Sequence, residues 1–64
     1  MAQPSDLGIA ILRLLNEGKA IEEISKSTGV RPAMVGMEVA RLELSGHIGA
    51  DGRLTDKGKA CLKG

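Results

Sequence analysis

The stretch IEEISKSTGVRP at residues 21–32 decides the fold of this chain. Ile21 and Ile24 are spaced as on one side of a short helix, which the pattern predicts from about residue 21 to residue 28. A glycine then supplies a turn, and Pro32 opens the next helix at its first position, where its missing amide costs nothing. Two helices joined by a tight glycine turn predict a helix-turn-helix.

The helix that begins at Pro32 is expected to continue to Ser45. Its buried stripe consists of three residues at spacings of four and three, namely Val35, Val39 and Leu42. Gly46 is expected to end the helix. An earlier helix is predicted from Asp6 to Glu17, because Ser5 or Asp6 can accept its first free backbone amides and Gly18 can end it in a left-handed conformation.

This first helix is apolar at more positions than one core-facing stripe needs. Ile9 and Leu12 fall outside the face formed by Leu7, Ile11 and Leu14. Two interpretations stay open: the chain forms a homodimer through this helix, or these two side chains pack under the neighbouring helices.

Beyond Gly46 the helical pattern stops. Residues 47–50 and 53–55 are expected to be extended around an Asp51-Gly52 turn, which predicts a small β-hairpin wing. A short helix follows, capped by Thr55 or Asp56 and reaching Leu62. The predicted fold class is mainly α with a β-hairpin wing: a winged helix-turn-helix of three helices plus a short C-terminal helix, in a single domain over residues 1–64.

Composition excludes several classes of protein. At 64 residues, 42% hydrophobic and 27% charged, the chain fits one small folded domain rather than a disordered segment. It has one cysteine and one histidine, so an internal disulfide and a structural zinc site are excluded. Cys61 is expected to be a packing residue, and His47 a surface residue at the start of the wing. Without Phe, Tyr or Trp, base stacking on aromatic side chains is excluded.

The sequence also contains no apolar run long enough to span a membrane and no signal sequence, so a soluble, cytoplasmic protein is expected. We find no phosphate-binding glycine loop, nucleophile constellation or metal motif. We therefore expect no enzymatic activity, no cofactor and no metal.

Three motifs resemble a known family: the stretch over residues 21–32, the sequence LELSGHI at residues 42–48 and the sequence LTDKG at residues 54–58. Together they resemble the winged helix-turn-helix domains of bacterial and archaeal transcription regulators, over about residues 7–62. The last motif is similar to the end of the wing in regulators of the multiple-antibiotic-resistance type. The second is similar to the C-terminal winged domain of DNA-processing protein A. The resemblance implies binding of double-stranded DNA in transcription regulation.

In a helix-turn-helix the second helix lies in the major groove, so the helix over residues 32–45 is expected there and the 47–55 wing on the DNA backbone. The candidate groove residues are Arg31, Ala33, Met34, Met37 and Arg41, and the candidate backbone contacts are Arg53, Lys57 and Lys59. These basic residues also fit an ordinary solvated surface, because exposed lysines are common in any protein.

The outward face of the same helix supports a different function. It carries only apolar side chains, Ala33, Met37, Ala40 and Leu44. Base recognition normally uses polar side chains, of which this face offers only Arg41 at its flank, with Arg31 at the helix start. Methionine adapts well to protein partners, so the alternative prediction is a protein-interaction module that uses this face.

Overall fold

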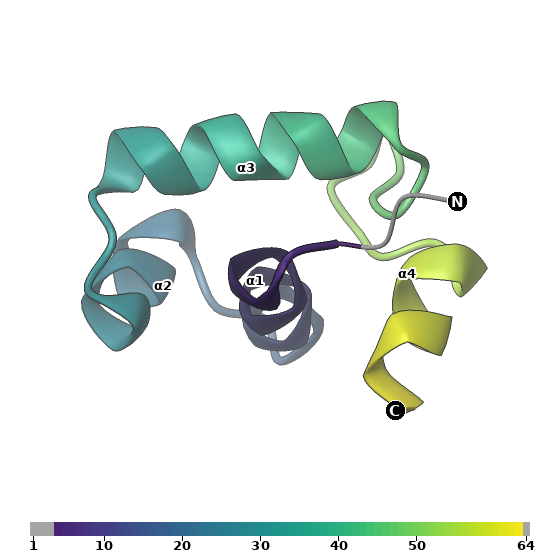
Figure 1. Cartoon of the computed structure of the whole chain (residues 1–64), viewed down its shortest axis with the longest axis horizontal. Coiled ribbons are helices and arrows are strands. Elements are labelled where there is room, and N and C mark those ends of the chain that lie inside the picture. Colours follow the sequence, from purple (N-terminus) through teal and green to yellow (C-terminus); the bar gives the residue numbers. More distant parts are fainter. Residues whose placement is uncertain (1–3, 64) are drawn as a thin grey trace.

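The computed structural model describes residues 4–63. Four α-helices and a terminal turn of 3-10 helix follow one another along the chain: α1 (Asp6–Asn16), α2 (Ile21–Thr28), α3 (Pro32–Leu44), α4 (Asp56–Ala60) and the 3-10 turn Cys61–Lys63. Figure 1 shows α3 lying across α1 and α2, with α4 on the side of α1 away from α2. The mainly α character predicted from the sequence is confirmed, and the first three helices lie within one residue of their predicted bounds.

Local chemistry explains where α1 begins and how closely it approaches α3. The Ser5 hydroxyl accepts a hydrogen bond from the Gly8 amide at 3.1 Å and so caps the helix, as predicted. Gly8 is buried, and a Cβ placed on it would lie 3.6 Å from Leu42 Cδ2. Beyond the last residue of the helix, Gly18 adopts a left-handed φ of +85°.

The turn between α2 and α3 takes only residues 29–31. Gly29 adopts a φ of +74°, which a residue without a Cβ does most easily. Two hydroxyls hold the turn: Thr28 donates to the Ile24 carbonyl at 2.8 Å, and Ser25 donates to the Val30 carbonyl. The predicted helix, glycine turn and helix are therefore confirmed as local structure.

The core lies where the first three helices meet the 3-10 turn and the segment between α3 and α4. Its members are Ile11, Leu12, Ile24, Val35, Leu42, Ile48 and Leu54, with Val39, Cys61 and others packed against them. Leu12 is fully buried, so it needs no second subunit to cover it, whereas Ile9 is half-buried. Of the two interpretations of the apolar surplus in α1, packing within the chain holds for Leu12. A homodimer through α1 stays a prediction.

The predicted β-hairpin wing is wrong, and with it the winged form of the fold. Within residues 4–63 there is no strand, only one antiparallel bridge between Ile48 and Leu54. The five residues between them, 49–53, include two glycines and an aspartate, which disfavour strand structure. They form a turn that is closed by a hydrogen bond from the Gly49 amide to the Arg53 carbonyl at 2.8 Å. The segment over residues 47–55, which we name the 47–55 loop, instead buries Ile48 and Leu54 in the core.

Candidate functional site

Among the described residues, three of the four exposed large apolar side chains lie on α3. Met37 is 62% exposed and Leu44 is 90% exposed, and Met34 beside them is 51% exposed. In Figure 1 no other helix covers the side of α3 opposite α1 and α2. We define the α3 face as Ala33, Met37, Ala40 and Leu44, all of which are exposed.

The spacing of these residues explains why they form one narrow strip. At 100° per residue, positions 33, 37, 40 and 44 fall within about 60° of each other around the helix axis. The buried residues Val35 and Leu42 lie on the opposite side. One side of α3 is therefore buried in the core, and the other side, which is also apolar, is exposed to water.

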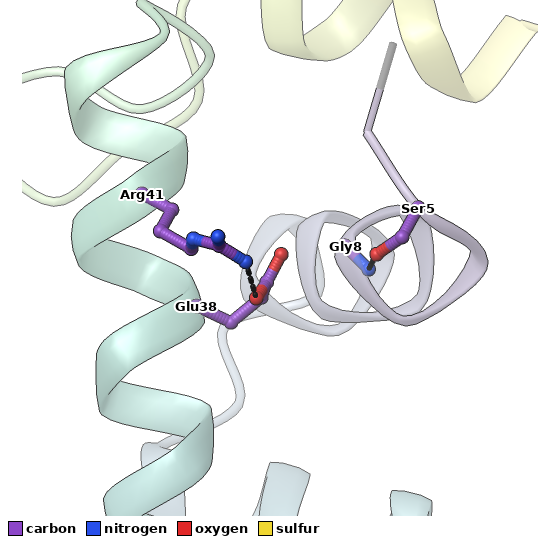
Figure 2. Close-up of polar contacts among 4 residues, drawn as sticks. All are labelled: Ser5, Gly8, Glu38 and Arg41. Atoms are coloured by element: carbon purple, nitrogen blue, oxygen red, sulfur yellow. Dashed lines mark hydrogen bonds and ion pairs between the residues drawn. The ribbon is translucent and has the colours of Figure 1, made fainter. Parts of the chain in front are cut away.

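Arg41, a candidate base-reading residue, lies beside the α3 face. Its side chain is 78% exposed, and its guanidinium is 3.7 Å from the carboxylate of Glu38, whose side chain is 18% exposed. Figure 2 shows the Glu38 side chain between α3 and the start of α1, with Arg41 turned toward it. Because Arg41 is exposed and the contact is long, an ion pair of this kind contributes only about 0.2–1 kcal/mol, and Arg41 is free to turn toward another partner.

The structure brings most of the other candidates to α3 as well. Arg31 is the exposed N-cap residue of α3, and the Met34 amide donates to its carbonyl at 2.9 Å. At the far end of the helix, the Lys57 ammonium donates to the Ser45 carbonyl at 2.8 Å. This bond satisfies a terminal carbonyl and places a cation at the negative end of the helix.

Two of the predicted backbone contacts lie elsewhere. Arg53 and Lys59 line an open depression together with Leu15, Asn16 and Gly18, and no residue of α3 contributes to its lining. The two cations are thus grouped beside the C-terminal end of α1. Arg53 was expected on a wing that follows a DNA backbone, but the described chain has no wing. Arg53 lies on the 47–55 loop instead.

The prediction that His47 is a surface residue is wrong. It is 3% exposed, not a surface residue, and its Nδ1 lies 2.6 Å from the Ser45 hydroxyl. Burial lowers the pKa of His47 below its usual 6.5, and the nearby positive charge of Lys57 lowers it further. Gly58 of α4 packs against the His47 carbonyl, and no signal in the sequence predicts this contact.

Other chemical features within the described residues are few. No helix in residues 4–63 has the length and apolarity to cross a membrane. Over the same range, the side chains of His, Cys, Asp and Glu form no group of three that could hold a metal ion. Cys61 is half-buried against the core, as predicted for a packing residue.

Comparison with known proteins adds no relative. The chain matches no protein-family model, and searches of curated proteins and of solved structures found no match either. The resemblance to winged helix-turn-helix domains therefore rests on the three sequence motifs alone, and membership of that family stays a prediction.

Proposed function

We propose that this chain is a protein-interaction module that binds a partner through the α3 face. The observation that carries the proposal is the exposure of Met37 (62%) and Leu44 (90%) on a strip without a polar side chain. Burial of one such side chain in a partner stabilises a complex by about 1.5–3 kcal/mol, before the cost of association. Contiguous exposed apolar surface of this kind marks contact sites in soluble proteins.

The charge of the helix supports the same choice. Glu38 and Glu43 offset Arg31 and Arg41, so α3 with its N-cap residue, the part that would enter the DNA groove, has no net charge. DNA affinity depends mainly on cations near the phosphates, and base discrimination on side-chain donors and acceptors. The α3 face offers neither. A cytoplasmic location is part of the proposal.

Site-specific photo-crosslinking tests the proposal. A benzophenone amino acid replaces Leu44, or Lys19 in the exposed link between α1 and α2 as a matched control, and the cells that make the chain are irradiated. We expect adducts from position 44 that survive nuclease treatment, that are absent from position 19 and that disappear on Met37→Asp. Nuclease-sensitive adducts, equal adducts from both positions, or none from position 44 would overturn the proposal.

A second candidate function, binding of double-stranded DNA in transcription regulation, has an observation of its own. Arg31 and Arg41 are both exposed on a helix that follows a three-residue turn, the arrangement by which a helix-turn-helix presents its second helix. In this hypothesis the groove residues are those of α3 and its N-cap, and Lys57, Arg53 and Lys59 contact phosphates. Gene regulation would follow from it.

An amide chemical-shift titration with a duplex of about 20 base pairs tests this second candidate at low and then physiological salt. DNA binding predicts shifts along α3 that fade with salt and weaken on Arg41→Ala. Shifts that are absent at low salt, or that are the same in the Arg41→Ala variant, would remove α3 from the DNA hypothesis.

A further inference from the structure

The order of small and large side chains along the α3 face is self-complementary. Positions 33, 37, 40 and 44 are separated by four, three and four residues, the spacing of the seam in a helix pair. Small and large alternate along it: Ala33, Met37, Ala40, Leu44. When two such helices run in opposite directions about a two-fold axis between positions 38 and 39, Ala33 faces Leu44 of the second copy and Met37 faces Ala40.

Each large side chain then packs against an alanine, so every layer of the seam has the same total volume. In a parallel pair each residue would face itself, and layers of two alanines would alternate with layers of two large side chains. Even packing density is what stable apolar contacts require. The antiparallel order also places the positive N-terminal end of each helix beside the negative C-terminal end of the other.

The charged residues at the edges of the seam permit this arrangement. On one edge, Arg41 comes opposite Met34 of the second copy, where its aliphatic stem can cover the exposed thioether. On the other edge, Glu43 comes opposite Gly36, and nothing lies within 4 Å of the place where a Cβ on Gly36 would be. Among the charged residues of α3 itself, which are Glu38, Arg41 and Glu43, none meets a like charge across the seam.

We propose that the occupant of the α3 face is a second copy of this chain, held as an antiparallel α3–α3 pair. This inference rests on the proposed function, because it names the partner of the same surface. α3 spans 13 residues, or about 20 Å, which gives an interface at the small end of specific contacts. We therefore expect a reversible dimer with a dissociation constant between about 10 μM and about 1 mM.

Sedimentation equilibrium of the full chain across that concentration range tests the pair. The mass average should rise toward twice the monomer mass as concentration increases. Leu44→Lys should weaken association at least about tenfold, because the new cation meets the positive end of the partner helix. The matched control is Ile21→Lys, which removes a 40% exposed apolar side chain at the start of α2, outside the α3 face, and should leave association unchanged. A monomer at every concentration, or equal effects of both variants, would overturn the inference.

Cysteine pairs test the register in a Cys61→Ala background. A mixture of Ala33→Cys chains and Leu44→Cys chains should form mixed disulfides under mild oxidation. Ala33→Cys chains alone should not, since two copies of position 33 would be about 16 Å apart along the helix axis and a disulfide needs Cα atoms within about 7 Å. Disulfides that form as readily in either chain alone as in the mixture would contradict the antiparallel pair.

The two proposals fail in distinguishable ways. If the chain is monomeric but position 44 yields position-specific adducts with a different protein, the second-copy inference is wrong and the docking function stands. If position 44 yields nucleic-acid adducts, both are wrong. Adducts of twice the chain mass that disappear on Met37→Asp support both.

Discussion

The two sides of α3 carry side chains of the same chemical type in opposite surroundings. Leu42 on the inner side is 3% exposed and packs in the core, whereas Leu44, two residues later, is 90% exposed. Apolar character alone therefore does not say what a residue in this helix does. The inner side stabilises the fold by burial, whereas the outer side contributes to stability only through helix propensity. The exposed apolar side chains of the outer side therefore need an explanation other than folding, such as contact with a partner.

The largest expected effect comes from the inner side. Leu42→Ala should lower the free energy of unfolding by about 2–5 kcal/mol, because it removes buried methyl groups and leaves a cavity among the helices. Urea denaturation followed by circular dichroism measures the change. A loss below about 1 kcal/mol would mean that the inner side is loosely packed, and the contrast between the two sides would fail.

Two helical glycines, one buried and one beside open space, should respond to alanine with changes in stability of opposite sign. Gly58 in α4 is buried, and a Cβ there would overlap the His47 carbonyl oxygen, so Gly58→Ala should destabilise by about 1–3 kcal/mol. Gly36 in α3 has open space at the same place, so Gly36→Ala should stabilise by up to about 1 kcal/mol through helix propensity. Thermal melts of the two variants should move in opposite directions; a shift of the same sign would show that the packing around α4 is not as described.

A third prediction concerns pH and the buried histidine. Because burial and Lys57 lower the pKa of His47 in the folded chain, the folded state disfavours the imidazolium form relative to the unfolded state. The stability that His47 contributes is complete above the ordinary pKa of 6.5 and is lost as the pH falls from there through the lowered pKa.

Melting temperatures of the wild-type chain and of His47→Gln, measured between about pH 8 and pH 5, check this prediction. The wild-type chain should lose stability toward the acid end more steeply than the variant, which lacks the buried imidazole. Parallel profiles would show that His47 is solvated in the folded state, as its position in the sequence had suggested.

Sequence patterns predicted the parts of this fold that local chemistry controls. The helix spacings, Ser5 as a cap, Gly29 as the turn and Pro32 as a first residue each act within a few positions along the chain, so α1, α2 and α3 could be located closely. The segment after Gly46 depends on distant contacts instead. The sequence predicts that Ile48 and Leu54 are strand residues. In the structure both side chains are buried in the core, and a single antiparallel bridge joins the two residues.

The candidate site was predictable only in part, for a similar reason. Helical periodicity was sufficient to assign Ala33, Met37, Ala40 and Leu44 to one outward strip of α3, and all four are exposed. Periodicity could not show that Arg53 and Lys59 gather beside the end of α1, nor that His47 is buried, since both depend on how the 47–55 loop folds back.

If the outer side of α3 serves contacts outside the fold, Leu44→Lys should separate association from folding. At low concentration, where the chain is monomeric, the free energy of unfolding of the Leu44→Lys variant should stay within about 0.5 kcal/mol of the wild-type value. The concentration-dependent association should be lost. A loss of stability close to that of Leu42→Ala would contradict this expectation, because Leu44 would then be part of the core and not of a free surface.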